Sequence, residues 1–188
     1  MYRTHRCNEI REQHIGNVVE LAGWVDVIRD HGGVLFVDLR DHYGITQVVL
    51  SDDKMIQGMP KETVILVEGI VAKRDEETVN AKLDTGLIEV KAEKIEVLGP
   101  CQLGLPFEIS SSTQTREEVR LKYRYLDLRN RKIHDNIVLR SKIVSYLRDQ
   151  MEDMGFMEIQ TPILTASSPE GARDYLVPSR KHKGKFYA

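Results

Sequence analysis

Hydrophobic and polar residues alternate along most of residues 18–98, and this period of two predicts β-strands. Turn-forming residues such as Gly32-Gly33 and Asp84-Thr85-Gly86 separate most of the apolar runs. One longer interruption, Asp52–Glu62, falls between the third and fourth runs. The five predicted strands are Val18–Arg29, Val34–Asp41, Gly44–Leu50, Thr63–Arg74 and Ile88–Leu98. Together they indicate a small closed β-barrel.

Five strands with a break after the third are typical of the OB-fold, although SH3-like barrels and half-sandwiches give similar patterns. In the second predicted strand, Leu35, Val37 and Leu39 share one face, and Phe36 shares the other with charged residues. An exposed aromatic ring among polar neighbours can stack on a nucleic-acid base, which is worth about 1–3 kcal/mol per base. The alternative, that another segment covers Phe36, is equally compatible with the pattern. Trp24 is expected in the core.

The remaining residues predict a different architecture. Residues 99–115 read as a linker, and helical spacing follows in Arg116–Leu128 and from about Asp135 to Met154. A short strand, Phe156–Gln160, is expected next, ended by Pro162. The predicted division is therefore a barrel domain over residues 1–103, a linker or hinge over 104–130, and an incomplete α/β segment over 131–188.

Composition excludes several classes of protein. The chain has 188 residues and a net charge of −2, with two isolated cysteines and no apolar run of the ~20 residues that span a bilayer. No secretory leader is evident, and a cytoplasmic protein is expected. Residues 1–105 carry 12 Lys and Arg against 18 Asp and Glu, so the barrel is a poor candidate for non-specific binding to phosphates. No phosphate-binding glycine loop, zinc-ligand spacing or complete active site is present.

The second half carries a specific resemblance. The stretch Arg120–Arg129, the helix after it, and the stretch Gly155–Leu164 resemble the first signature motif of class II aminoacyl-tRNA synthetases, in the aspartate, asparagine and lysine subgroup. Residues 168–180 are similar to the aspartyl, bacterial-type branch. In the barrel, Phe36–Asp41 and Gly44–Val49 resemble the anticodon-binding domain of the same branch. The resemblance covers essentially the whole chain.

This resemblance implies roles for five barrel residues. Phe36 would stack on an anticodon base, and Gln47 would bind the central uridine. Arg29 and Arg74 would contact bases or backbone, and Glu89 would read the first anticodon base. An aromatic face with amide and carboxylate edges suits the readout of unpaired RNA bases.

The resemblance also implies a substrate loop and a dimer. Glu170 would bind the α-ammonium group of L-aspartate, and Pro162 would lie at a homodimer interface. The rest of the substrate loop would be Ser168, Pro169, Gly171, Ala172, Arg173 and Asp174. On local chemistry alone, the sequence favours a plain surface loop over a substrate loop here.

The implied activity is ATP-dependent activation of L-aspartate and its transfer to tRNA(Asp), with Mg²⁺ neutralising phosphate charge in the parent enzyme. No protein metal site is expected in this chain, nor any cofactor bound to it. His31 leaves open whether tRNA(Asn) is a second partner, because the family associates this residue with relaxed discrimination. The family's later motifs do not follow Ala188, so the chain is expected to be an inactive fragment. The alternatives are a stand-alone RNA-binding module and a generic OB-fold protein.

Overall fold

The structure is a computed structural model that describes residues 2–51, 56, 58–102, 104–166 and 174–188. These residues divide into two compact units, one up to residue 135 and one from residue 136 to 188, which are described separately. The elements of the first unit are η1 (Glu12–His14), β1 (Val18–His31), β2 (Val34–Arg40), β3 (Ile45–Leu50), β4 (Val64–Lys73), η3 (Glu76–Thr78), β5 (Ile88–Gly99), η4 (Ile109–Gln114), α1 (Glu117–Lys122) and α2 (Arg124–Asp127). Helix α3 (Arg131–Asp153) begins in the first unit and continues into the second, which also holds β6 (Val177–Pro178) and β7 (Phe186–Tyr187).

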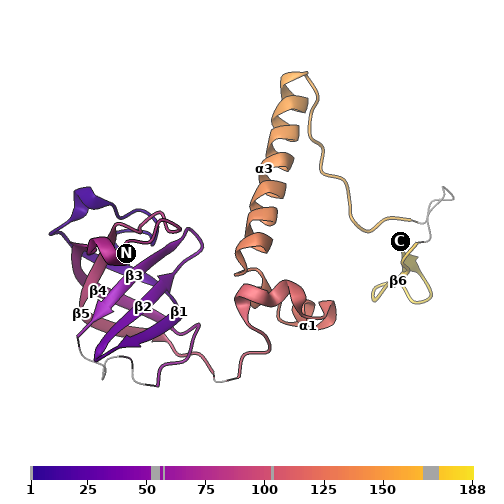
Figure 1. The fold of residues 1–188 in the computed structure, drawn as a ribbon. Helices are drawn as coiled ribbons and strands as arrows, with labels where there is room; N and C mark the ends of the chain where they lie inside the picture. The colour runs from indigo at the N-terminus through magenta and orange to yellow at the C-terminus, as the bar shows by residue number, and fades with distance from the viewer. Residues whose placement is uncertain (1, 52–55, 57, 103, 167–173) are drawn as a thin grey trace. The chain divides into compact units, whose positions relative to one another are not determined.

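Strands β1 to β5 form a closed barrel in the order β1-β2-β3-β5-β4, with β4 paired back to β1 (Figure 1). The predicted barrel is therefore confirmed, and each strand starts and ends within two residues of its predicted bounds. Alternate side chains point inward and are almost fully buried, as the period of two requires. The barrel core includes Val19, Leu21, Val25, Val37, Leu39, Val48, Leu50, Ile65, Val67, Val71, Ile88 and Val90, and the buried Cys7 and Ile10 close one part of it.

Two glycines allow the strands to approach closely. A Cβ at Gly23 would lie 2.5 Å from the carbonyl oxygen of Arg40, and one at Gly69 would lie 2.3 Å from that of Lys91. Both positions therefore require glycine. The barrel closes through β3 and β5, which run parallel and pair only at Val48 with Val90 and at Val49 with Lys91. The antiparallel pairing of β4 with β5 is much longer.

Residues 105–130, here called the hinge segment, have a small core of their own. Phe107, Ile109 and Leu126 are buried together. Beside them, the buried Asp127 accepts hydrogen bonds from Ser112 (2.8 Å) and from Arg120 Nε (3.0 Å), and it also pairs with Arg124. Burial alone would raise the pKa of Asp127, but these hydrogen bonds and the two arginine charges outweigh it and hold that pKa below its usual value. The hinge segment therefore has folded structure of its own and is more than a linker. The predicted domain boundaries at residues 103 and 130 stay predictions.

Helix α3 begins four residues before its predicted start. The side chain of Asn130 accepts hydrogen bonds from the amides of Lys132 (3.0 Å) and Ile133 (3.4 Å), so Asn130 caps the helix in place of Asp135 or Asn136. Gly155, with φ of 88°, lies two residues beyond the last helical residue, as expected for a C-terminal stop.

The predicted strand at Phe156–Gln160 is wrong, because these residues are exposed and pair with no strand in the described part of the chain. Alternation and composition predict only the β-strand propensity of a segment. A strand also needs a neighbouring strand to pair with its backbone hydrogen-bonding groups. Near the end of the chain, β6 and β7 instead pair as a short antiparallel ladder. Within the described ranges, no helix is both long and apolar enough to cross a membrane.

Candidate nucleic-acid interface

The five barrel residues with predicted roles lie on four strands and the turn after β4. In β2, Leu35, Val37 and Leu39 are buried and Phe36 is half-buried on the outer face, as the alternation predicts. The ring of His31 stands edge-on to the Phe36 ring, with centroids 5.5 Å apart and planes at 75°. Phe36 is therefore outside the hydrophobic core.

Three of the other residues form one hydrogen-bonded row across the barrel. Arg29 donates two hydrogen bonds of 2.7 Å to the carboxylate of Asp38, and its Nη2 lies 3.4 Å from Gln47 Oε1. The Gln47 amide in turn donates to Glu89 Oε2 at 3.2 Å. The register explains this order, because Asp38 pairs with Gln47 across β2 and β3, and β3 lies beside β5. The Asp38 hydrogen bonds raise the pKa of Arg29, so its charge is secure.

Arg74 differs from its expected role in being buried, with 4% of its surface exposed. Its Nε donates to the carbonyl of Ile88 (2.8 Å) and its Nη1 to that of Thr78 (3.4 Å), while its Nη2 is buried without a partner. Burial lowers the pKa of Arg74, and the charges of Glu89 and Asp38 oppose that shift. A buried donor without a partner is unfavourable, but burial also closes this nitrogen off from solvent, so the role of Arg74 in contacting a base or phosphate stays a prediction.

We call Arg29, Phe36, Asp38, Gln47, Arg74 and Glu89 the reading face. Its two arginines balance its two carboxylates. Such a surface gains little from neutralising phosphates, but it offers an aromatic ring and several donors and acceptors. It is therefore suited to contacting base edges.

The remaining predicted residues lie elsewhere or outside the described residues. Glu170 and the loop positions Ser168, Pro169, Gly171, Ala172 and Arg173 fall within 167–173, which the structure does not describe. Asp174 and Pro162 are exposed residues of the second unit. Their predicted roles in substrate binding and dimer contact stay predictions.

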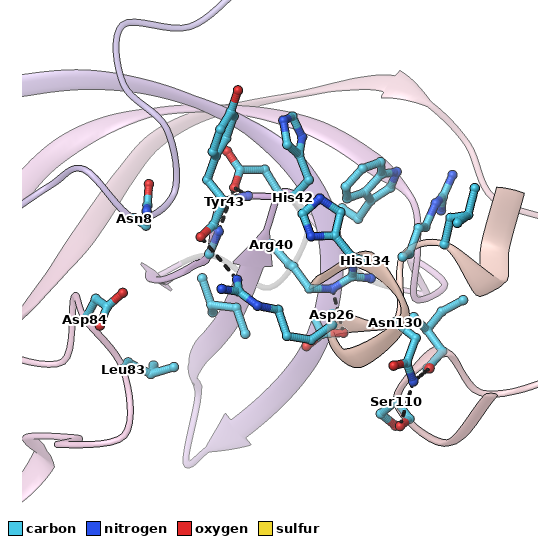
Figure 2. A pocket seen from close by; sticks show the side chains of 18 of the residues that line it. Asn8, Asp26, Arg40, His42, Tyr43, Leu83, Asp84, Ser110, Asn130 and His134 are labelled. Atoms are coloured by element: carbon cyan, nitrogen blue, oxygen red, sulfur yellow. Dashed lines mark hydrogen bonds and ion pairs between the residues drawn. The ribbon is translucent and has the colours of Figure 1, made fainter. Parts of the chain in front are cut away.

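Away from the reading face, a hollow of about 660 Å³ lies between the barrel and the hinge segment (Figure 2). The rings of His42, Tyr43 and His134 line it, together with Trp24, Arg40 and Asn130. The expectation that Trp24 lies in the core is wrong: it is half-buried, on the outward-facing positions of β1. Trp24 shares one face of its strand with Glu20, Ala22 and Asp26, and this alternation indicates an outward-facing side chain. Its large apolar ring was the reason for expecting it in the core.

Two family models match this chain. The OB-fold nucleic acid binding domain matches residues 19–98, and the tRNA synthetases class II (D, K and N) match residues 116–188. The match over the barrel and the match over the second half therefore concern two consecutive parts of one chain.

Curated relatives match the whole chain. An aspartate–tRNA(Asp/Asn) ligase from Ehrlichia ruminantium (strain Welgevonden) is 55% identical over 193 residues, covering 100% of this chain and 32% of the relative. One from Paracoccus denitrificans (strain Pd 1222) is 54% identical over 191 residues, with the same coverages. The chain thus spans about a third of the length of these relatives.

Among solved structures, the asparaginyl-tRNA synthetase from Pyrococcus horikoshii complexed with asparaginyl-adenylate is similar, with a TM-score of 0.81 and 25% identity. The match covers 100% of this chain and 42% of that one.

Proposed function

Because the chain belongs to the class II aminoacyl-tRNA synthetases of the aspartate, lysine and asparagine group, we propose that its barrel reads a tRNA anticodon on behalf of an aspartate–tRNA ligase. The observation that carries this proposal is the hydrogen-bonded row of Arg29, Asp38, Gln47 and Glu89 beside the Phe36 ring. These side chains hold one another in place before any RNA binds. Preorganised polar groups lose less conformational entropy on binding.

In the proposed complex, an unpaired base stacks on Phe36 and neighbouring bases meet the polar row. The Gln47 amide has both a donor and an acceptor, which match the hydrogen-bonding edge of a uridine. A base that takes over the internal hydrogen bonds exchanges one set for another, so a base with the wrong edge leaves buried groups unpaired. This penalty for the wrong base is the proposed source of specificity.

We propose tRNA(Asp) and tRNA(Asn) as the RNA partners. The relatives named above are ligases for tRNA(Asp/Asn), and His31 contacts the ring on which an anticodon base would stack. A histidine edge tolerates more than one neighbouring base, since it can donate or accept a hydrogen bond.

The parent reaction follows from the same proposal. The carboxylate of L-aspartate attacks the α-phosphate of ATP and releases pyrophosphate, and the terminal hydroxyl of the tRNA then takes the aspartyl group and releases AMP. Glu170 would hold the α-ammonium group of aspartate, and Pro162 would contribute to a homodimer. The part of the chain that the structure describes holds no group of three or more His, Cys, Asp or Glu fit to bind a metal. ATP and Mg²⁺ enter the proposal through the reaction of the parent enzyme alone.

A stand-alone RNA-binding module is the rival proposal, favoured by one observation: the barrel core is complete without the second unit. Both proposals predict anticodon binding. They differ in whether a longer enzyme containing this sequence activates aspartate.

The test is the affinity of the 188-residue chain for anticodon stem-loops, measured by fluorescence anisotropy. We expect the aspartate and asparagine stem-loops to bind, and replacing the central uridine with cytidine to weaken binding roughly tenfold, or about 1–2 kcal/mol. Equal affinity for all three stem-loops would contradict base reading. The same chain should show no aspartate-dependent exchange of pyrophosphate into ATP, and measurable exchange would contradict its assignment as an inactive part of an enzyme.

A further inference from the structure

A buried carboxylate joins the barrel to the hinge segment. Glu62, just before β4, accepts a hydrogen bond from Arg129 Nη1 at 2.7 Å on one carboxylate oxygen, and its other oxygen pairs with Arg40 Nη2. Its side chain is only 3% exposed. Arg40 is the last residue of β2 and Arg129 is the penultimate residue of the hinge segment, so a single residue bridges the two.

The backbone of Glu62 is unusual. Its φ is 66°, and it is the one non-glycine residue with a positive φ among those the structure describes. Glycine and asparagine are favoured in this left-handed region, while glutamate is strained there. Because the backbone alone would favour glycine, the carboxylate itself must explain why glutamate suits this position.

The side chain of Trp24 completes the bridge. The guanidinium carbon of Arg129 lies 4.5 Å from its ring centroid, and that of Arg40 lies 5.4 Å from it. Arg40 also pairs with Asp26 at 3.2 Å, and both residues line the hollow in Figure 2. Two arginines thus face two carboxylates around one aromatic ring, and removing Glu62 would leave Arg129 without its carboxylate.

Strands β1 and β2 each carry residues of both the reading face and the bridge. Phe36, Asp38 and Arg40 follow one another on the outer face of β2, about 13 Å from first to last at 3.3 Å per residue. Trp24 and Arg29 both lie on β1. A change at Asp38 is therefore two residues from an arginine that contacts Glu62.

We propose that Glu62 is a positioning residue that couples RNA binding at the reading face to the position of the hinge segment. This inference rests on the proposed function. A base that takes over the bonds of Arg29 to Asp38 changes the outer face of β2; Arg40 responds, and Glu62 carries the response to Arg129. The hinge segment then holds a different position on the barrel with and without RNA.

The experiment measures a distance inside the first unit. Spin labels are placed at the exposed Lys91 of β5 and the exposed Leu121 of α1, each replaced by cysteine in a Cys101→Ser background, because Cys7 is buried. Pulsed electron resonance gives the distance distribution with and without the anticodon stem-loop. We expect the stem-loop to shift this distribution in the chain with Glu62 and not in Glu62→Gln, although that variant still binds RNA.

Two further variants separate transmission from a general loss of structure. Arg129→Gln removes the hinge-side partner while Arg40 keeps Glu62 paired, and it should also abolish the shift. Lys61→Gln is the matched control, because Lys61 also pairs across to the hinge segment, with Glu108 at 3.3 Å, but both side chains are more than half exposed. It should respond as the parent chain does.

A parent chain that binds the stem-loop without a shift would overturn the inference while leaving anticodon binding intact. A shift that persists in Glu62→Gln would overturn it as well. Absence of any stem-loop binding by the parent chain would instead overturn the proposed function and, with it, this inference.

Discussion

The barrel and the second unit treat their apolar residues in opposite ways. In the barrel, Leu39, Val48 and Ile65 are fully buried by the other strands. In residues 136–188, Met157 is 83% exposed and Ile163 is 94% exposed, and none of the described side chains of that unit is buried. A strand sequence that alternates can complete its own core by closing on itself, whereas an amphipathic helix needs another surface.

This contrast indicates which part of the chain can support a proposed site by itself. The reading face is supported by a finished core, so its geometry belongs to the chain itself. Helix α3 carries apolar side chains that no other described residue covers, among them Ile137, Val144, Leu147 and Met151. The proposed homodimer contact at Pro162, in the same unit, likewise depends on surfaces that this chain does not show.

The largest expected effect comes from truncating a core leucine. Leu39→Ala in β2 should lower the free energy of unfolding by about 2–5 kcal/mol, because it leaves a cavity in a closed barrel. Leu147→Ala on α3 is the matched control and should change it by less than about 0.5 kcal/mol, since the side chain is exposed. Denaturant titrations followed by the fluorescence of Trp24, the single tryptophan, would measure both. Equal losses would contradict the contrast.

A smaller effect should show whether the hinge segment behaves like the barrel. Asp127→Asn should destabilise the hinge segment by about 1.5–3 kcal/mol, because hydrogen bonds to Arg120 and Arg124 lose their charged acceptor. Since the pKa of Asp127 is lower in the folded state, its contribution is complete above the ordinary aspartate pKa and is lost as pH falls through the folded value.

The readout for Asp127 is hydrogen exchange across residues 105–130 between pH 3 and pH 6. The parent chain should lose protection in acid, and Asp127→Asn should lack that pH-dependent step. An identical acid profile in the two proteins would assign the step to another carboxylate.

Phe36→Ala separates binding from folding within the barrel. It should weaken binding of the anticodon stem-loop by about 1–3 kcal/mol through lost stacking, with little change in unfolding because the ring lies outside the core. Ile70→Ala, at a partly exposed position of β4, serves as the control with unchanged affinity. Anisotropy titrations measure both variants, and undiminished affinity in Phe36→Ala would remove Phe36 from the interface.

The smallest effect is expected from an exposed ion pair of the second unit. Arg148 and Glu158 lie 3.2 Å apart, and both side chains are more than half exposed. Glu158→Gln should change the unfolding free energy by about 0–0.5 kcal/mol, because water and salt screen such pairs. A loss comparable to that of Asp127→Asn would show that this unit has more internal structure than its exposure indicates.

Much of the barrel follows from local pattern. Alternation specifies which side chains of β2 point inward, and turn residues specify where strands end, so these strands were predictable from the sequence. The pattern fails where a partner decides the outcome: Phe156–Gln160 has strand-like composition, but no strand of the described residues lies beside it. It also fails at Asn130, whose capping role depends on an amide two residues later.

The candidate site shows the same limit. Parity places Phe36 outside the core, and the resemblance to a known family supplied Gln47 and Glu89. Neither indicated that Arg29 is held by Asp38, that Arg74 is buried, or that Glu62 bridges two arginines. These facts depend on which segments become neighbours: residues 29 and 38 meet when β1 pairs with β2, and residues 62 and 129 meet when the hinge segment packs against the barrel.

The short parallel pairing of β3 with β5 has a consequence for motion. It joins the barrel at only two register positions, next to Gln47 and Glu89, whereas the other junctions are longer. Transient opening of a closed sheet should begin at its shortest ladder. The groups proposed to read RNA therefore lie beside the β3–β5 junction, where the sheet should open most often. A bound nucleotide that contacts both strands would reduce this opening.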